Sequence, residues 1–423
     1  MENDYKKPRI LLLGGTKDSC EIVNEAHRMG IFVCVADYLT NSPAKKIADK
    51  SFLVDATDID AITKLCMKEN VDGLITGYVD MLLPYAEKIC CQSGLPFWGD
   101  AKSINMCINK KLFKEACEES ELSVVPWKTV NQNNYTNAID FDFPVVIKPA
   151  DNSGSRGVYK CYNKNRFVSL CQKAFEYSKS GELLVERLMN INQEFSVYYI
   201  LCNGEVILTS MGDRFVNSID NSLAPLGQGM LFPSVHLKEW EQKMQKPINR
   251  FFANNNMKEG FVFLQGFYEN GEFYIHEIGY RLNGGYTYKI VEYYSGYNQI
   301  QELIRFSLTG TMDSTSIHKS DPYFRGKGLV LTLALRTGTI AEIVGVDEAK
   351  GIEGVIDCIT LHDVGDKLTS VCTTAQVFAY VICVAKDLLG LRNTVSRVID
   401  TIRVIDTNGN DMILLPLNPD RLI

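Results

Sequence analysis

The chain has 423 residues, of which 46% are hydrophobic, and a formal net charge of −7 at pH 7. This length predicts two or three domains with sizeable hydrophobic cores, and the acidic balance argues against nucleic acid as a partner. The longest apolar run, Val377–Ala385, is about half as long as a membrane span requires. No signal-peptide core is present near the N-terminus, so the sequence predicts a cytoplasmic protein.

The 13 cysteines do not follow the pattern of a zinc site or of a disulfide-rich protein. No pair with the C-x₂-C spacing occurs among Cys90, Cys91, Cys107 and Cys117, and the chain has only 5 histidines. We therefore expect buried, reduced thiols.

Residues 9–100 are predicted to alternate between strands and helices, an order typical of a parallel α/β sheet. Gly14 and Gly15 follow the first strand and Asp37 the second. The third glycine of a dinucleotide fingerprint is missing, so a nicotinamide cofactor is disfavoured. We expect the loops 14–17 and 76–80 to bind a small substrate instead, because ligands of open α/β sheets lie at the strand ends. The expected strands are 9–13, 31–36 and 73–76, and the expected helices 18–29, 60–68 and 84–93.

A lysine followed by a loop of small residues marks the middle of the chain. The apolar strand 145–147 ends at Lys148, and residues 151–157 are Asp, Asn, Ser and Gly except for Arg156. Glycines let successive backbone N–H groups converge on an anion, and Lys148 adds a positive charge. The stretch therefore predicts a polyphosphate site, with a surface turn and an exposed lysine as the alternative.

The remaining elements are predicted to be hairpins and helices on either side of this loop. Asn203-Gly204 and Asn270-Gly271 predict the turns of two hairpins, within 194–210 and 260–278. The other expected elements are helices at 101–119, 164–178, 300–309 and 374–388, and strands at 183–186 and 401–406.

Four short motifs occur in a fixed order along the chain. They are Lys110, Lys148 with Gly154-Ser-Arg-Gly157, Glu186-Arg187-Leu188-Met189 ahead of Glu194, and Glu277 four residues before Arg281. With these motifs the chain resembles the ATP-grasp superfamily, and within it carboxylate–amine ligases such as L-amino acid ligases and phosphoribosylamine–glycine ligase. The sequence has no G-x-x-x-x-G-K-[ST] motif, so a P-loop is excluded as the nucleotide site.

The resemblance implies a fold of mixed α/β and α+β class with three parts. A Rossmann-like pre-ATP-grasp domain would occupy residues 1–100, and the two-lobed ATP-grasp core residues 101–320. The small lobe of this core would span about 120–187, and a C-terminal α+β domain would occupy 321–423.

The resemblance also implies roles for individual residues. Glu277 matches a magnesium-binding carboxylate, and Arg281 matches the arginine that holds the substrate carboxylate and the transferring phosphoryl group. Arg281 and Lys148 are thus the predicted catalytic residues. The residues that match phosphate-binding positions are Lys110, Lys148, Ser153, Gly154, Ser155 and Gly157. Those that match the adenine hinge and the ribose-binding position are Glu186, Arg187, Met189 and Glu194.

Two positions depart from the pattern of the superfamily. Gln265 stands where an acidic metal ligand is usual, and Gly279 stands where asparagine is usual. A hard cation prefers carboxylate oxygen to amide oxygen, so the predicted metal site of Gln265 and Glu277 is depleted. An ATP-binding protein with lost or regulatory activity is therefore the alternative to an enzyme.

The resemblance implies a ligase that uses ATP, with Mg²⁺ or Mn²⁺, to activate a small carboxylate as an acyl phosphate and join it to an amine. Amino acids are candidate substrates and a homodimer is a candidate assembly, whereas neither nucleic acid nor a membrane is expected as a partner. A biotin-carboxylase-like reaction is disfavoured because Val-Glu-His does not follow Arg281. A ligase of the phosphoribosylamine–glycine type stays open, because it shares the three-domain layout.

Overall fold

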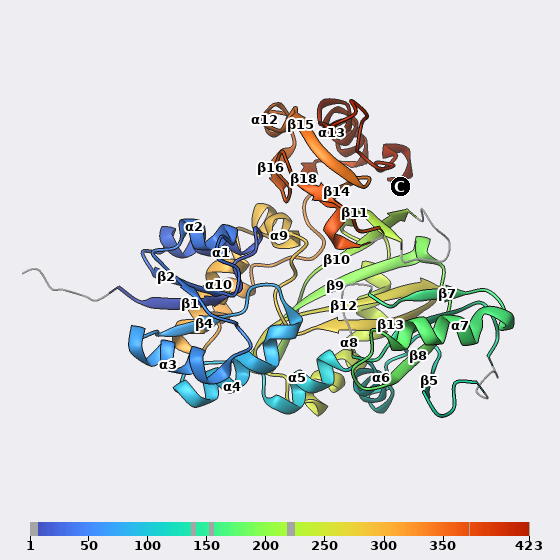
Figure 1. Cartoon of the computed structure of the whole chain (residues 1–423), viewed down its shortest axis with the longest axis horizontal. Coiled ribbons are helices and arrows are strands. Elements are labelled where there is room, and N and C mark those ends of the chain that lie inside the picture. Colours follow the sequence, from blue (N-terminus) through green and yellow to red (C-terminus); the bar gives the residue numbers. More distant parts are fainter. Residues whose placement is uncertain (1–6, 137–140, 152–155, 218–224, 372, 423) are drawn as a thin grey trace, which may run out of the picture.

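The computed structural model describes residues 7–136, 141–151, 156–217, 225–371 and 373–422. A parallel sheet of N-terminal residues lies at one end of the molecule and a small antiparallel sheet at the other, with a larger sheet between them (Figure 1). The C-terminal elements lie at the top of this view, and some of their strands belong to the larger sheet. The mixed α/β and α+β class expected from the sequence is confirmed.

The N-terminal sheet has the strand order β3-β2-β1-β4, and its paired strands run parallel. The expected elements are present as β1 (Arg9–Leu13), β2 (Phe32–Asp37), β4 (Gly73–Ile75), α1 (Ser19–Arg28), α3 (Ile59–Glu69) and α4 (Leu83–Ser93). The sequence did not predict α2 (Pro43–Ile47) or β3 (Lys50–Leu53). β3 is an edge strand with mostly exposed residues, so it lacks the apolar pattern of a buried strand.

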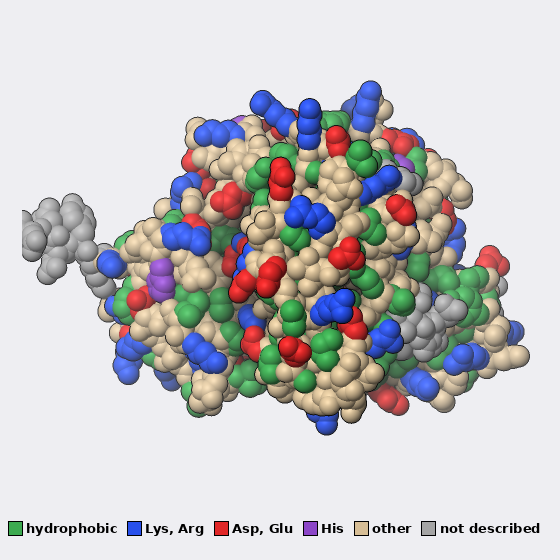
Figure 2. All heavy atoms as spheres, turned by 90° about the horizontal axis from the view of Figure 1, so that it is seen from above, with side chains coloured by type: hydrophobic (Ala, Val, Ile, Leu, Met, Phe, Trp, Pro, Cys, Tyr) green, Lys and Arg blue, Asp and Glu red, His purple; other side chains and the backbone are tan. Residues whose placement is uncertain are grey.

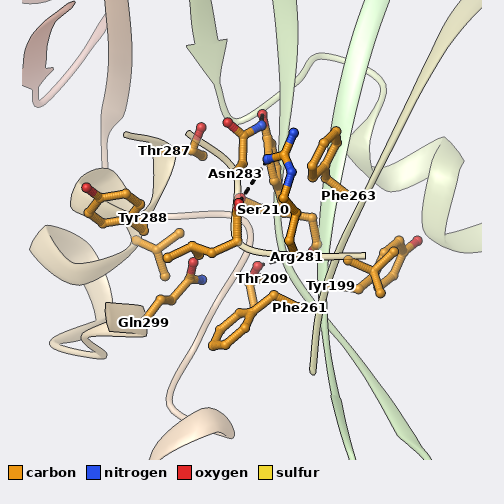
Figure 3. A pocket seen from close by; sticks show the side chains of 14 residues that line it. Tyr199, Thr209, Ser210, Phe261, Phe263, Arg281, Asn283, Thr287, Tyr288 and Gln299 are labelled. Carbon is orange, nitrogen blue, oxygen red and sulfur yellow. Dashed lines mark hydrogen bonds between the residues drawn. The ribbon is translucent and has the colours of Figure 1, made fainter. Parts of the chain in front are cut away.

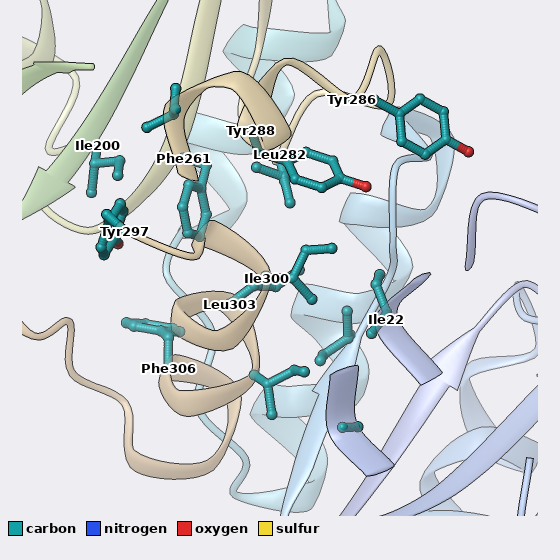
Figure 4. Packing of buried hydrophobic residues seen from close by; sticks show 14 of the residues in the cluster. Ile22, Ile200, Phe261, Leu282, Tyr286, Tyr288, Tyr297, Ile300, Leu303 and Phe306 are labelled. Atoms are coloured by element: carbon teal, nitrogen blue, oxygen red, sulfur yellow. The ribbon is translucent and has the colours of Figure 1, made fainter. Parts of the chain in front are cut away.

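Helix α10 (Gln299–Thr309) connects the N-terminal sheet to the larger sheet through one hydrophobic core. Ile300, Leu303 and Phe306 of this helix are buried in the same cluster as Ile22 of α1 and Phe261 of β12 (Gly260–Glu269) (Figure 4). The helix lies directly on β4. A Cβ at Gly73 would come within 2.5 Å of the Ser307 carbonyl oxygen, so this close approach requires glycine.

The single helix predicted over 101–119 is wrong, because the chain breaks it at Asn109 into α5 (Ala101–Ile108) and α6 (Lys110–Glu119). Asn109 is extended, and its side-chain oxygen accepts the backbone N–H groups of Lys111 and Leu112 at 3.0 and 3.2 Å. Asparagine is a favoured residue at this capping position. Lys110 is therefore the first residue of a helix, and its backbone N–H donates to the Ala150 carbonyl at 3.1 Å.

The small antiparallel sheet has the order β5-β8-β6-β7, and α7 (Lys164–Phe175) packs against it through a shared core. Its strands are β5 (Trp127–Asn131), β6 (Val145–Pro149), β7 (Tyr159–Cys161) and β8 (Glu182–Arg187). In the β6–β8 register, Val146 lies opposite Glu186 and Lys148 opposite Leu184. Lys148 and Glu186 are thus diagonal neighbours on one face of the sheet.

The larger sheet has eight strands in the order β13-β12-β9-β10-β11-β14-β18-β16. Both predicted hairpins are confirmed, with Asn203-Gly204 and Asn270-Gly271 at positive φ as their tight turns require. The sheet is continuous across residue 320, and the domain division expected there stays a prediction. Its further strands are β9 (Glu194–Cys202), β10 (Glu205–Asn217), β11 (Leu226–Phe232), β13 (Glu272–Gly279), β14 (Lys327–Ala334), β16 (Val355–Thr360) and β18 (Val377–Ala385).

The helix predicted at 374–388 is also wrong, because Val377–Ala385 is the strand β18. It pairs with β14 on one side and β16 on the other, and most of its residues are buried. The periodicity of a short apolar run cannot separate a buried strand from a buried helix, and the β-branched residues here favour the strand. The helix of this region is α13 (Leu388–Thr401), which begins where Asp387 accepts the Gly390 N–H at 2.8 Å.

The remaining elements complete the surface of the molecule. They include α8 (Leu237–Asn254), α9 (Thr287–Ser295), α11 (Ser314–Ile317), α12 (Val346–Lys350) and the sheet β17-β15-β19 (Lys367–Leu368, Gly338–Val344 and Arg403–Asp406). On the face shown in Figure 2, Lys and Arg side chains are interspersed with Asp and Glu. None of the helices in the described ranges is long and apolar enough to cross a membrane.

Candidate functional site

A buried carboxylate between two lysines lies where the small sheet meets α6. Glu186 of β8 contacts Lys148 of β6 through Oε2 and Nζ at 2.8 Å. Its other oxygen, Oε1, lies 2.9 Å from Nζ of Lys114 on α6. The Lys114 side chain is 0% exposed, and its ammonium also donates to the Val125 carbonyl at 3.2 Å. The sequence predicted Lys148 and Glu186 as site residues and missed Lys114.

Electrostatics keep this carboxylate charged. Burial disfavours ionisation of Glu186, but the charges of Lys114 and Lys148 outweigh it and lower the pKa of Glu186 to about 2. Burial lowers the pKa of Lys114 and of Lys110 below the ordinary lysine value. The cluster thus consists of one acidic side chain, Glu186, in contact with two basic ones, Lys114 and Lys148.

Lys110, the first residue of α6, lies between the small sheet and the larger one. The ammonium of Lys110 interacts electrostatically with Glu277, Lys148, Glu186 and Asp80. These four partners come from β13, β6, β8 and the 3₁₀ turn Asp80–Leu82. Residues that are far apart in the sequence are thus brought into one site.

The predicted hinge follows β8. Arg187 contacts Glu269 at 2.8 Å through Nη2, and its guanidinium lies over the Tyr274 ring, 5.4 Å from the centroid. Met189 is buried, with 5% of its surface exposed. Glu194 begins β9 and forms an ion pair with Arg214 of β10, which raises the pKa of Arg214. The sequence missed Arg214, which approaches from the neighbouring strand.

The predicted metal residues face each other across a hairpin. Gln265 of β12 lies directly opposite Glu277 of β13, and the Gln265 amide donates to Ser196 Oγ at 3.3 Å. Among the residues that the structure describes, no group of three or more His, Cys, Asp or Glu side chains is arranged to hold a metal ion. A cation here would depend on the single carboxylate of Glu277, the Gln265 amide and oxygen atoms of a ligand.

The predicted catalytic arginine reaches into the N-terminal region. Arg281 donates from Nε to Asp80 Oδ1 at 2.7 Å and from Nη2 to Asp80 Oδ2 at 2.5 Å. Its Nη1 donates to the Leu282 carbonyl at 3.1 Å, and the guanidinium lies 5.1 Å from the Phe263 ring centroid. The carboxylate that pairs with Arg281 is thus Asp80, which ends the 76–80 loop expected to bind substrate.

Residues in or next to both N-terminal loops also contact the segment after β13. The Tyr286 hydroxyl donates to the Asp18 carboxylate, and the Tyr78 and Tyr288 rings stack with centroids 6.4 Å apart. Asp37, which first suggested a dinucleotide site, accepts the Gly15 N–H at 2.6 Å and so fixes the loop after β1. These contacts give Asp37 a structural role.

A small cavity lies beside Arg281, between the larger sheet and α9 (Figure 3). Ser210, Asn283, Thr287 and Tyr288 line it with Arg281, and it encloses about 10 Å³. This volume is close to that of one water molecule by the same measure. The cavity is therefore too small for a nucleotide.

The loop after Lys148 is described only in part. Ser153, Gly154 and Ser155 lie outside the described residues. Gly157 is described and has a φ of +76°, and a Cβ there would come within 3.0 Å of Pro149 and closer still to Tyr177. This position therefore requires glycine.

One more residue near the carboxylate cluster was missed. His276 on β13 stacks on Phe267 with ring centroids 5.0 Å apart, and its Nε2 is buried without a hydrogen-bond partner among the described residues. Burial and then the charge of Lys148 hold the pKa of His276 well below its ordinary value. Lys114 could have been found, because it follows Lys110 by one helical turn. His276 and Asp80 give no comparable signal.

Several known proteins are similar to this chain. Residues 109–219 match the family described as "Carbamoyl-phosphate synthase L chain, ATP binding domain". The formate-dependent phosphoribosylglycinamide formyltransferase of Sulfurisphaera tokodaii is 29% identical over 198 residues, or 45% of this chain and 49% of that protein. The chain spans about half the length of the curated relatives it matches.

Two solved structures share the fold over nearly the whole chain. The L-amino acid ligase of Bacillus licheniformis has a TM-score of 0.78 at 17% identity, over 95% of this chain and 99% of that one. The biotin carboxylase domain of the Hydrogenobacter thermophilus 2-oxoglutarate carboxylase has a TM-score of 0.76 at 15% identity, over 96% and 91% of the two chains. The chain thus contains a segment, residues 109–219, that matches an ATP-binding domain, and it has the ATP-grasp fold over nearly its whole length.

Proposed function

We propose that the protein is an ATP-dependent carboxylate–amine ligase. The observation that carries this proposal is the position of Lys110, whose ammonium interacts with Lys148 and Glu186 of the small sheet and with Glu277 and Asp80 beyond it. All four sequence motifs that resemble ATP-grasp ligases therefore converge on one site. The reactions of the matched relatives belong to those proteins, and ligation by this chain is the proposal.

The proposed reaction has two steps. A carboxylate oxygen of the first substrate attacks the γ-phosphorus of ATP, the bond to the β-phosphate oxygen breaks, and ADP leaves. The amine then attacks the acyl carbon, inorganic phosphate leaves, and the amine gives up a proton. A free carboxylate has no good leaving group at neutral pH, so the first step supplies one. The protein contributes mainly by positioning the reactants and neutralising charge.

We assign the charge neutralisation to the cations of this site. Lys110 and Lys148 would contact the phosphates of ATP. Arg281 has five N–H donors, of which Asp80 accepts two and the Leu282 carbonyl one, so that two have no acceptor among the described residues and could serve a ligand. A guanidinium held in this way presents a fixed pair of donors to carboxylate or phosphoryl oxygens.

A divalent cation fits the site only together with the nucleotide. Mg²⁺ commonly binds through one or two protein carboxylates plus substrate phosphates, and Glu277 supplies one carboxylate beside the amide of Gln265. We propose that Mg²⁺ or Mn²⁺ is held there and would neutralise charge on the phosphates when bound. The compared biotin carboxylase domain is a dimer with bound ADP and magnesium, and a homodimer of this chain is the corresponding proposal on assembly.

The proposal is tested by measuring phosphate release from ATP with pools of amino acids and small carboxylic acids, each with and without pooled amines. We expect release that needs both a carboxylate and an amine, and that is lost in Lys148→Ala. A second candidate is an ATP-binding protein without ligase activity, which the amide at position 265 favours. Tight ATP binding without phosphate release in any pool would support that candidate and contradict the ligase.

A further inference from the structure

The buried lysine of α6 has no role in the reaction proposed above. Lys114 is 0% exposed, and its ammonium is held by Glu186 Oε1 at 2.9 Å and by the Val125 carbonyl at 3.2 Å. Glu186 contacts Lys148 through its other oxygen. One carboxylate thus connects a lysine that cannot reach solvent with a lysine that we place at the nucleotide phosphates.

The arrangement has a consequence for the charge of Lys148. Two lysines and one glutamate leave the cluster with one net positive charge. Without Lys114, Glu186 and Lys148 would form a neutral pair, and the carboxylate would compete with an anionic ligand for the Lys148 ammonium. Burying an ammonium as completely as Lys114 is costly unless it is paired. Lys114 is paired through Glu186, so the carboxylate that contacts Lys148 is shared with a second cation.

We propose that Lys114 is a positioning residue for Lys148. By neutralising Glu186 it lets the carboxylate orient Lys148 through a hydrogen bond, while the positive charge of Lys148 stays available to the phosphates of the nucleotide. The inference rests on the proposed nucleotide site and does not depend on ligase chemistry. It predicts that the affinity for phosphates follows the net charge of the cluster, whichever residues provide that charge.

The test compares ATP with adenosine, which has the same base and ribose but no phosphates. Calorimetry would measure both affinities for the wild-type chain, Lys114→Met, Glu186→Gln and the double variant Lys114→Met/Glu186→Gln. Lys111→Met is the matched control, because Lys111 lies on the same helix and contacts Glu182 at 3.5 Å with a partly exposed side chain. Circular dichroism and thermal unfolding would show which variants fold.

We expect Lys114→Met to weaken ATP binding about tenfold, the scale of one lost charge at this range, while adenosine affinity changes by less than about twofold. The double variant restores one net positive charge and should bind ATP within about threefold of wild type. Equal losses for ATP and adenosine in Lys114→Met, or no recovery in the double variant, would overturn the proposal.

If Lys114→Met does not fold, the ATP affinity of the double variant Lys114→Met/Glu186→Gln tests the proposal. This variant removes the Lys114 charge and the Glu186 charge together, and the amide introduced at position 186 keeps an acceptor oxygen for the Lys148 ammonium. Near wild-type ATP affinity would therefore support the inference, and a loss as large as that of Lys148→Ala would overturn it. Failure of the ligase proposal would give a different experimental result from failure of this inference. A wild-type chain that binds ATP but releases no phosphate would remove the proposed activity and leave this test unchanged.

Discussion

The ion pair between Asp80 and Arg281 provides a direct test of the proposed catalytic arginine. We expect Asp80→Asn to lower ligase turnover about tenfold and to leave ATP affinity nearly unchanged. Asparagine keeps the size of the side chain and one acceptor oxygen. Its amide NH₂ group, however, would face one of the Arg281 nitrogens that now donate to Asp80 at 2.7 and 2.5 Å. The guanidinium would then lose one of the two contacts that fix its plane.

The magnitude follows from the contacts and their exposure. Hydrogen bonds to charged groups contribute about 1.5–3 kcal/mol each. The side chains of Arg281 and Asp80 are 13% and 30% exposed, so solvent screening favours the lower end of this range. A loss of about 1.4 kcal/mol in positioning the guanidinium corresponds to a tenfold lower rate. Removing the donor itself, in Arg281→Ala or Arg281→Lys, should cost about 10²–10³ in turnover.

The assay measures kcat and KM by phosphate release and the Kd of ATP by calorimetry, on purified variants with the substrate pair found in the screen. Asp347→Asn is the control, because Asp347 forms an exposed pair with Lys350 at 3.1 Å on α12 and should keep wild-type turnover. Wild-type turnover in Asp80→Asn would refute the assigned role of the pair. Parallel losses of turnover and ATP affinity would show that the pair only supports the structure.

Three further predictions concern the nucleotide site. Lys148→Ala should weaken ATP binding at least about tenfold by calorimetry, since Glu186 keeps Lys114 as a partner and the chain should still fold; unchanged affinity would contradict the phosphate role. Gln265→Glu should lower the magnesium concentration needed for ATP binding, because it adds a carboxylate opposite Glu277, and an unchanged magnesium dependence would argue against a metal at this position. The pKa of Glu186 falls from 4.5 to about 2 in the folded chain, so its pairing adds stability above pH 4.5 that is lost as the pH falls toward 2. Glu186→Gln should therefore flatten the pH dependence of the free energy of unfolding in this window, measured by urea titration, and an unaltered slope would count against the ion cluster.

Local signals in the sequence explain which parts of the fold could be predicted. The Asn-Gly turns located both hairpins, because a two-residue turn demands positive φ and few residues adopt it. Asn109 was an equally local signal for the start of α6, but the apolar spacing on both sides of it resembles one long helix. β18 was misassigned because its burial comes from two neighbouring strands that the sequence does not place beside it.

The features of the candidate site also fall into those that the sequence could predict and those that it could not. Lys148 and Glu186 could be predicted because motifs with fixed spacing carry them. The pairing of Asp80 with Arg281 could not be predicted, because 201 residues of sequence separate the two and nothing near either residue specifies the contact. The order of motifs therefore predicted which residues gather at the site, whereas the charges that hold them in place depend on how the sheets approach each other.

The core around α10 limits how this protein could be recombined with its relatives. The helix begins at Gln299, far beyond β4, which ends at Ile75, and Ile22 of α1 shares its cluster with Ile300 and Phe261. A chimera that exchanged residues 9–100 alone would place a foreign sheet against this helix, with the Gly73–Ser307 contact as the first point of collision. Exchange of the N-terminal sheet between homologues should therefore succeed only when α10 is transferred with it. The part of the protein that can be exchanged thus consists of two segments that are not contiguous in sequence.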